Sequence, residues 1–147
     1  MKRIISIFTI ALVFSACGNV KHQDQQATDD EKTENPSSLY DKEWRLLSID
    51  GEPIKVDSTF AKFPNLTFKE DSLAFSGSGG CNGYGGKFQL EENNGISFPY
   101  VAATEMACPN MELEQRFFDA LRNTKSYLIK SDTLTLYKDG NVAAGYV

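Results

Sequence analysis

The chain has 147 residues, a formal net charge of −5 at pH 7 and a hydrophobic content of 41%. This length allows one folded domain with short appendages. The acidic balance argues against a nucleic-acid partner, because such a partner requires a basic surface.

The first residues, 1–16, have the pattern of a bacterial lipoprotein signal peptide. Lys2 and Arg3 precede an almost wholly apolar run over residues 4–14, which is too short for a permanent membrane span. The run ends in Phe14-Ser15-Ala16-Cys17, which resembles a lipobox with Phe in place of the commoner Leu. We therefore expect cleavage before Cys17 and a lipid anchor on this cysteine. The alternative is an ordinary secretory signal with a cysteine there by chance.

Residues 17–38 are expected to form the lipidated N-terminus and a flexible acidic tether. The segment is rich in polar residues and holds almost no apolar ones, so it cannot bury enough surface to offset the entropy of ordering. Loss of Lys2 and Arg3 with the signal changes the net charge from −5 to −7. We expect a protein of the bacterial cell envelope that meets the membrane through its lipid. Gly18, in place of the Asp that retains many lipoproteins at the inner membrane, favours the outer membrane.

Two cysteines, Cys81 and Cys108, remain once Cys17 carries the lipid. Disulfides persist in exported proteins, and an even pair of cysteines there usually bridges, so we predict a bond between them. In the chain-entropy model, closing a loop of about 28 residues stabilises the fold by roughly 3.6 kcal/mol. The alternative is a pair of free, buried thiols.

The folded domain is expected over residues 39–147, and it begins with strands. A strand is predicted at Trp44–Ile49, a turn at Asp50-Gly51 that Glu52-Pro53 extends, and a short return strand at Ile54–Val56. Period-two alternation then predicts four further strands: Leu66–Phe68, Leu73–Phe75, a segment through Phe88 and Leu90, and Ile96–Tyr100. Glu70-Asp71 and Asn94-Gly95 are the turn signals between them, and Asn94-Gly95 is typical of a type I′ turn.

A glycine-rich run interrupts these strands, with glycines at Gly77, Gly79, Gly80, Gly83, Gly85 and Gly86. Such a run predicts reversals, bulges or close backbone approach. A phosphate cradle would need to open a helix, whereas Gly86 leads into an alternating, strand-like segment. We therefore interpret the run as structural. Valine at Gly83 or Gly86 is expected to cost roughly 1–3 kcal/mol through backbone strain.

The apolar period changes after Pro109. Leu113, Phe117, Ala120 and Leu121 fall on one helical face, which predicts a helix over Asn110–Asn123 with Asn110 as its N-cap and Glu112 and Glu114 near its positive end. Strands resume at Tyr127–Ile129, Leu134–Tyr137 and Val142–Tyr146. This order predicts an α+β fold: a curled antiparallel sheet, or cracked β-barrel, with one α-helix packed across it.

Several motifs together resemble the META/HslJ domain family over residues 40–147. They are Trp44 with Leu46 and Gly51, Pro64-Asn65-Leu66-Thr67-Phe68, Gly80-Cys81-Asn82-Gly83-Tyr84-Gly86, Ala103-Thr104-Glu105-Met106-Ala107-Cys108, Glu114-Phe117-Ala120-Leu121 and Leu134-Leu136. The resemblance implies a small cracked antiparallel barrel with one helix, similar in shape to secretion pilotin lipoproteins. It also implies a bacterial envelope protein associated with heat shock, drug tolerance, or secretion and motility. No catalytic residue is implied.

The sequence predicts no catalytic residue, no metal site and no cofactor. The only histidine, His22, lies in the tether, which excludes a Ser-His-Asp or Cys-His arrangement inside the domain. A zinc site without imidazole would need both cysteines and carboxylates, an uncommon set of ligands. Glu112 and Glu114 are expected on a solvated helix face, and Glu105 is interpreted as a cap or turn residue in preference to a functional acid.

Two functions from different classes follow. The favoured one is a non-catalytic, stress-related envelope module that binds a protein or lipid partner or protects other proteins. The alternative is a hydrolase or transferase that acts on envelope glycans through carboxylates. A facing pair of acids in a cleft would favour the enzyme, and an apolar or aromatic groove would favour the binding module. The oligomeric state stays open.

Overall fold

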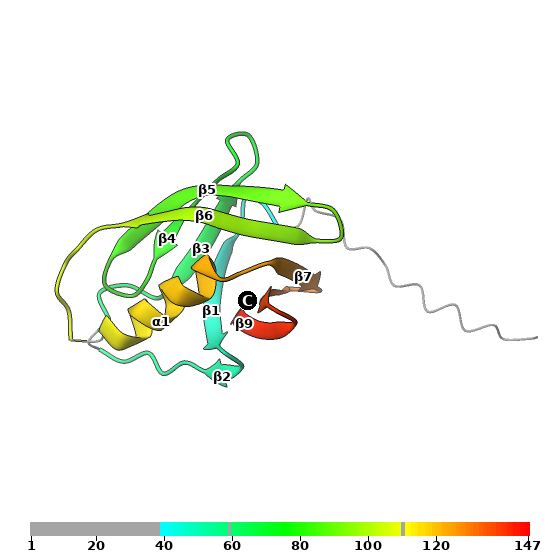
Figure 1. Cartoon of the computed structure of the whole chain (residues 1–147). Helices are drawn as coiled ribbons and strands as arrows, with labels where there is room; N and C mark the ends of the chain where they lie inside the picture. The colour runs from blue at the N-terminus through cyan, green and yellow to red at the C-terminus, as the bar shows by residue number, and fades with distance from the viewer. Residues whose placement is uncertain (1–38, 59, 110) are drawn as a thin grey trace, which may run out of the picture. The chain divides into compact units, whose positions relative to one another are not determined.

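The computed structural model describes residues 39–58, 60–109 and 111–147. The signal peptide, Cys17, the tether and the Asn110 cap therefore lie outside the described residues. Those residues form nine strands and one helix (Figure 1). The strands are β1 (Glu43–Ile49), β2 (Glu52–Pro53), β3 (Asn65–Lys69), β4 (Ala74–Ser78), β5 (Gly83–Glu91), β6 (Gly95–Ala103), β7 (Ser126–Lys130), β8 (Thr133–Lys138) and β9 (Asn141–Tyr146), and the helix is α1 (Met111–Arg122).

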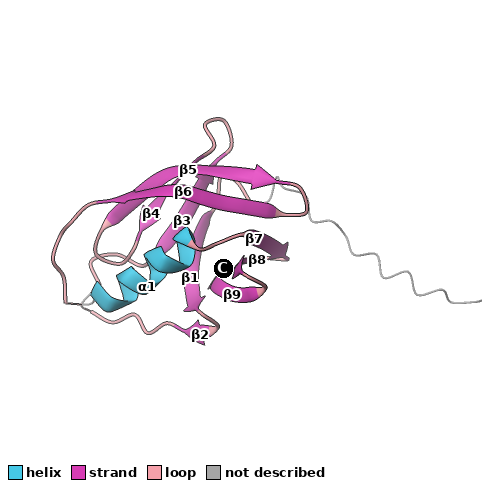
Figure 2. Cartoon of the chain, viewed as in Figure 1, coloured by secondary structure: helices cyan, strands magenta, loops and turns pink. Residues whose placement is uncertain are grey.

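The strands form one curled antiparallel sheet. Their order follows the chain from β3 to β9, with β1 and β2 on the other side of β3, and β1 also pairs with β9. The sheet therefore closes on itself, but unevenly: β6 and β7 share a single register pair, Gly95 with Ser126. The helix α1 packs against β6, β9 and β1, and it lies beside the β5–β6 hairpin (Figure 2). The predicted α+β class, a cracked barrel with one helix, is confirmed.

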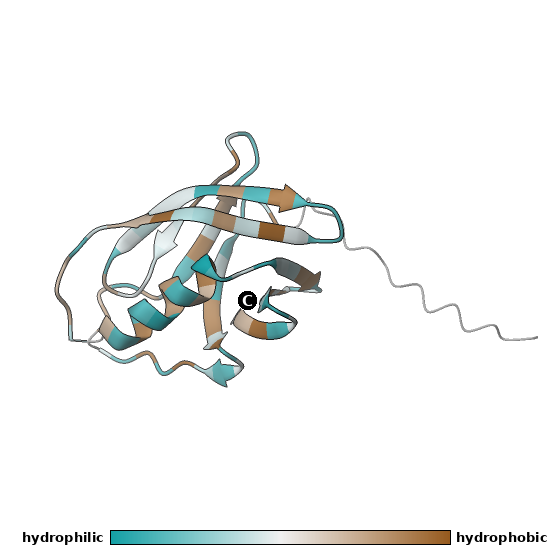
Figure 3. Cartoon of the chain, viewed as in Figure 1, coloured by the Kyte–Doolittle hydropathy of each residue, from teal (hydrophilic) through white to brown (hydrophobic). Residues whose placement is uncertain are grey.

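The core lies between the inner face of the sheet and α1. Apolar and polar residues alternate along the strands (Figure 3), and the inward residues include Trp44 of β1 and Phe68 of β3, both fully buried. Aromatic rings fill the interior: the Phe68 and Phe88 centroids lie 5.1 Å apart and meet edge to face. From the helix, Phe117 is fully buried and its ring lies 5.4 Å from that of Tyr84. Burial of this face holds α1 against the sheet.

Three local predictions differ from the structure. Asp50 and Gly51 both have positive φ, at 52° and 80°, and this tight turn pairs Ile49 with Glu52. The return strand is therefore Glu52–Pro53, and the prediction of a strand at Ile54–Val56 is wrong.

The other two differences also concern turns. The β5–β6 turn has its positive φ angles at Asn93 and Asn94, 57° and 58°, one residue before the predicted Asn94-Gly95. Gly95 already belongs to β6. Leu73, predicted to begin a strand, lies in the β3–β4 turn with φ 47°. A tight turn can shift by one residue when neighbouring residues also tolerate the left-handed region, as asparagine does.

Candidate functional site

The glycine run extends from the end of β4 into β5, and most of its glycines are required by close packing. A Cβ on Gly77, Gly85 or Gly86 would collide with a backbone oxygen of a neighbouring strand. Within the run only Gly80 has a positive φ, of 112°. Gly83 is different, because a Cβ there would have its nearest neighbouring atom 4.0 Å away. The expectation of strain at Gly83 is therefore wrong.

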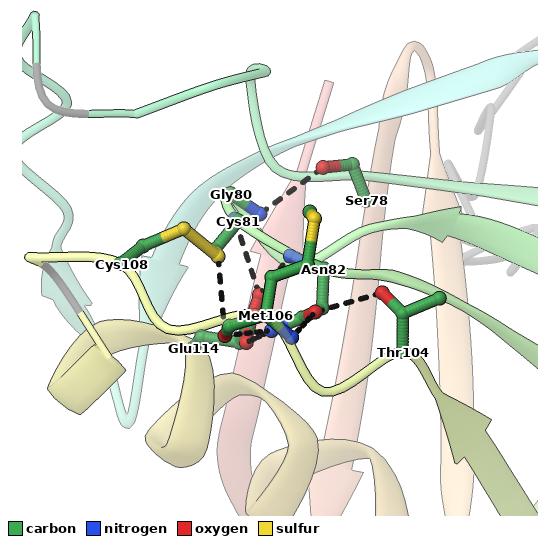
Figure 4. The surroundings of a disulfide bond; sticks show 8 residues. All are labelled: Ser78, Gly80, Cys81, Asn82, Thr104, Met106, Cys108 and Glu114. Carbon is green, nitrogen blue, oxygen red and sulfur yellow. Dashed lines mark hydrogen bonds between the residues drawn. A yellow bond between two sulfur atoms is a disulfide. The ribbon is translucent and has the colours of Figure 1, made fainter.

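The connection between β4 and β5, residues 79–82, forms a tight turn that we call the glycine turn. Two of its backbone N–H groups, those of Cys81 and Asn82, point at an anion, the side-chain carboxylate of Glu114 (Figure 4). Cys81 N and Asn82 N donate to Glu114 Oε2 at 3.1 and 2.6 Å, and Asn82 Nδ2 donates to Oε1 at 2.6 Å. Successive N–H groups of this kind make an anion-binding concavity. Here the protein fills that concavity with its own side chain.

Glu114 is 2% exposed, so the prediction of a solvated helix face is wrong for this residue. It lies in the first turn of α1, on the face that also carries Phe117, Phe118 and Leu121. That spacing of i, i+3, i+4 and i+7 is visible in the sequence and is the signal for burial. Gly79 makes room for the carboxylate, since a Cβ there would lie 2.7 Å from Glu114 Oε2.

Asn82 joins the glycine turn to the segment between β6 and α1, residues 104–108, which we call the β6–α1 loop. Asn82 Oδ1 accepts hydrogen bonds from Thr104 Oγ1 and Met106 N, both at 2.7 Å. Asn82 Nδ2 also donates to Met106 O at 3.2 Å. The oxygen and the nitrogen of this buried side-chain amide are thus both satisfied, as burial of a polar group requires. Sequence reasoning missed this role of Asn82.

The cysteines fasten the same two segments covalently. Cys81 of the glycine turn and Cys108 of the β6–α1 loop are joined by a disulfide, with Cα atoms 6.1 Å apart and a sequence separation of 27 (Figure 4). Glu114, Asn82 and the disulfide therefore connect three segments: the glycine turn, the β6–α1 loop and the start of α1.

A depression of about 340 Å³ opens beside this network. Its lining combines apolar side chains with two acids: Asn82, Thr104, Glu105, Met106, Ala107, Met111, Glu114, Gln115 and Phe118. Met106 is 52% exposed and Glu105 is exposed, so the β6–α1 loop forms an accessible rim. A larger depression of about 460 Å³ is lined by Asp41, Lys69, Glu70 and Asp71. These side chains are all charged and exposed.

The site offers hydrogen bonding and apolar contact but little reactive chemistry. Both oxygens of Glu114 accept hydrogen bonds from the protein, and both cysteines of the domain are oxidised. In the described part of the chain, no group of three or more His, Cys, Asp or Glu side chains is placed to hold a metal ion. Over the same residues, no helix has the length and hydropathy needed to cross a bilayer.

The six residues of this network and its rim, Cys81, Asn82, Thr104, Met106, Cys108 and Glu114, all belong to the motifs that carry the family resemblance. A family model of the META domain matches residues 37–145. The chain belongs to the META domain family. The predicted family is thereby confirmed, and the match covers all the strands and the helix of this META domain except the final residue of β9.

Solved structures agree with this META domain in fold. A protein from Burkholderia xenovorans, solved by NMR, has 26% identity and a TM-score of 0.60, over 86% of this chain and 96% of that one. A second protein solved by NMR has 25% identity and a TM-score of 0.59, over 76% and 93%. A crystal structure of a DUF4847 family protein from Bacteroides vulgatus, at 19% identity and a TM-score of 0.54 over 76% and 95%, shares the fold alone. Comparison with curated proteins finds no match.

Proposed function

We propose that this chain is a lipid-anchored protein of the bacterial envelope, at the outer membrane, whose META domain is a non-catalytic binding or protective module connected with stress. The anchor rests on Phe14-Ser15-Ala16-Cys17 and the acidic segment that follows it. The binding surface is the depression beside Glu114, where apolar side chains are accessible.

One observation carries the preference for binding over catalysis. Among the described residues, Glu114 is the only buried side chain that carries a charge, and both of its oxygens are used to hold the glycine turn. A general acid or base needs an oxygen within reach of a substrate. Met106, Met111 and Phe118 meanwhile give the depression an apolar lining, which is the usual character of a ligand site.

The anchor is tested by replacing Cys17 with Ser and comparing membrane and soluble envelope fractions. The wild-type chain should be in the membrane fraction and should incorporate an alkyne-labelled fatty acid. The variant should be soluble and unlabelled. A cleaved Cys17→Ser protein that stays in the membrane fraction would contradict the anchor.

The binding surface is tested by photo-crosslinking in intact cells. A diazirine amino acid replaces Met106 at the rim of the depression or, as a control, Leu128 on β7, which is 41% exposed. We expect a discrete adduct from position 106 that is absent from position 128. A partner at this surface would be contradicted if both positions gave the same adducts, or if position 106 gave no adduct.

The second candidate function is the carboxylate-dependent hydrolase or transferase. It is kept because Glu105 and Glu114 line the same depression, which places two acids around one space. Envelope glycans incubated with purified protein should stay intact by mass spectrometry. Cleavage or transfer that is lost in Glu105→Gln would replace the binding proposal with the enzyme.

A further inference from the structure

The depression has a deformable apolar surface. Met106 and Met111 contribute flexible thioether side chains, and Phe118 contributes a ring that is 7% exposed. Methionines adapt to apolar side chains of different shape and are common at peptide-binding grooves. The volume of about 340 Å³ is near the lower end of ligand sites. It suits a few side chains of a peptide better than a whole cofactor.

The charged side chains that line the depression are both acidic. Glu105 and Glu114 line the depression, and no Lys or Arg does. Glu112, which is exposed, adds a third carboxylate to the first turn of α1 but does not line the depression. Arg116 Nη2 lies 3.8 Å from Asp50 Oδ2, away from the depression. Arg122 pairs with Asp119 at 2.9 Å, and its guanidinium also lies 5.9 Å from the centre of the Phe118 ring.

Within the described residues, the negative charge of these glutamates is not neutralised by ion pairs or by the positive N-terminal end of α1. The ion pairs found among the described residues include none of the three glutamates named above. The N-terminus of a helix provides only about half a positive charge. Glu114 is also held by neutral N–H groups, which stabilise the carboxylate without cancelling its charge. Complementary charge on a partner is therefore positive.

The same features disfavour other occupants. An anionic ligand would meet an anion concavity that Glu114 already fills. Residues 18–38 of the chain itself are polar and acidic, so they match neither the apolar floor nor the charge. A second copy of the chain is acidic overall, with a net charge of −5 before and −7 after loss of Lys2 and Arg3. Anionic headgroups would be repelled likewise.

We propose that the depression binds a cationic amphipathic peptide segment, in which apolar side chains are flanked by Lys or Arg. The apolar side chains enter between the β6–α1 loop and the first turns of α1, and the cations lie against Glu105 at the rim. This inference rests on the proposed binding role and adds the chemistry of the partner.

The experiment measures binding by fluorescence anisotropy to the full chain carrying Cys17→Ser, purified without detergent. Three labelled peptides of equal length are compared. One is an amphipathic helix of leucine and lysine. The second has glutamate in place of every lysine, and the third has serine in place of every leucine. The leucine–lysine peptide should bind at least about tenfold more tightly than either of the others, since both charge and apolar contact are needed.

Matched variants separate the site from the net charge of the protein. Glu105→Lys should weaken binding of the leucine–lysine peptide about tenfold, while Glu92→Lys in the exposed β5–β6 turn makes the same change in net charge and should leave it within about twofold. Met106→Ser should weaken binding, whereas Leu128→Ser on β7 should not.

Equal losses in Glu105→Lys and Glu92→Lys would overturn the inference, because attraction would then be non-specific. Preference for the leucine–glutamate peptide, or no binding of any of the three, would overturn it too. In each of these outcomes, a specific crosslink at position 106 would still support the proposed binding role. Failure of the cationic-peptide inference can therefore be told apart from failure of the binding role itself.

Discussion

Glu114 and Asn82 show how two polar side chains can organise an otherwise apolar end of the domain. A buried carboxylate is costly unless its oxygens are hydrogen-bonded. Here Glu114 accepts two bonds from backbone N–H groups and one from the Asn82 amide. Hydrogen bonds to a charged group contribute about 1.5–3 kcal/mol each. The hydrogen bonds between Glu114 and the glycine turn, including the Asn82 amide, therefore stabilise the conformation of this turn.

Replacing Glu114 with Gln should destabilise the domain by about 1–3 kcal/mol. The shape is kept, but the new NH2 group cannot accept from Asn82 Nδ2 and turns a hydrogen bond into a contact between two donors. Glu112→Gln, on the exposed side of the same helical turn, should change stability by less than about 0.5 kcal/mol. Urea unfolding of both variants measures the difference, and equal midpoints would contradict the role given to Glu114.

Because two tyrosines are buried, we expect the folded domain to lose stability at alkaline pH. Burial raises the pKa of Tyr84 and Tyr146 well above 10 in the folded protein, and the neighbouring Tyr146 raises that of Tyr84 further. In the unfolded chain a tyrosine loses its proton near pH 10. The unfolded state therefore binds fewer protons above this pH, and stability that is fully present below pH 10 is lost as pH rises toward the folded pKa values.

Above about pH 10 the expected slope is about 1.4 kcal/mol per pH unit for each of the two tyrosines, and below this pH they contribute no slope. Tyr146→Phe should remove about half of this slope. At neutral pH the same variant should be at least as stable as the wild type, because the Tyr146 hydroxyl has no hydrogen-bond partner among the described residues. Tyr100→Phe is the control, since Tyr100 is 72% exposed. Urea unfolding between pH 8 and 11 checks this, and an unchanged slope in Tyr146→Phe would refute it.

At the scale of elements, β5 contains glycines with opposite tolerance for a side chain. Gly86→Val places a Cβ against the backbone oxygen of Tyr100 and the ring of Phe75, and it should cost about 1–3 kcal/mol. Gly83→Val meets open space and should be neutral or slightly stabilising, because valine favours strands. The melting temperatures of the two variants, measured by thermal unfolding, test this difference. A lower melting temperature for Gly83→Val than for Gly86→Val would contradict the packing.

The disulfide should stabilise the junction between the glycine turn and the β6–α1 loop. Exchange of Cys81 and Cys108 for Ser should lower the unfolding free energy by roughly 3–4 kcal/mol, since the open chain regains loop entropy. The fold should survive, because the core does not depend on the bridge. A dithiol reductant should shift the urea midpoint of the wild type to that of the double variant and leave the variant unchanged. A wild type that is insensitive to the reductant would count against this contribution.

The sequence predicted the elements that local patterns define. Alternation located most strands, and helical spacing located α1 to within a residue or two of its ends. The predicted boundaries were wrong where a turn could shift by one residue, as at Asn93 and Asn94. They were also wrong where the strand is only two residues long, as in β2. Such short pairings depend on the partner strand and not on a period of their own.

The candidate site was predicted only in part. The cysteine pair and the structural glycines followed from composition, but the Glu114–Asn82 contact joins residues 32 apart in the chain. No local pattern specifies such a contact. The position of Glu114 among buried phenylalanines was the available hint, and it was outweighed by the general preference of glutamate for solvent.

At the scale of the whole domain, closure of the sheet depends on β9. This strand pairs with both β8 and β1, and its residues Ala143, Ala144 and Tyr146 are fully buried. Deletion of residues 141–147 should therefore abolish the cooperative thermal transition. Deletion of Val147 alone removes two backbone hydrogen bonds to Arg45 and should only lower the melting temperature. A cooperative melt in the longer deletion would show that β9 is dispensable.

The pairing of β1 with β9 also governs when the domain can fold during synthesis. Leu46 finds its partner Tyr146 only at the other end of the chain. A ribosome adds roughly 5–20 residues per second. Several seconds therefore pass between the synthesis of β1 and that of β9, its pairing partner. Contacts of such long sequence separation also slow folding. The nascent domain therefore cannot close its sheet until β9 has emerged, which leaves time for chaperones to engage it first.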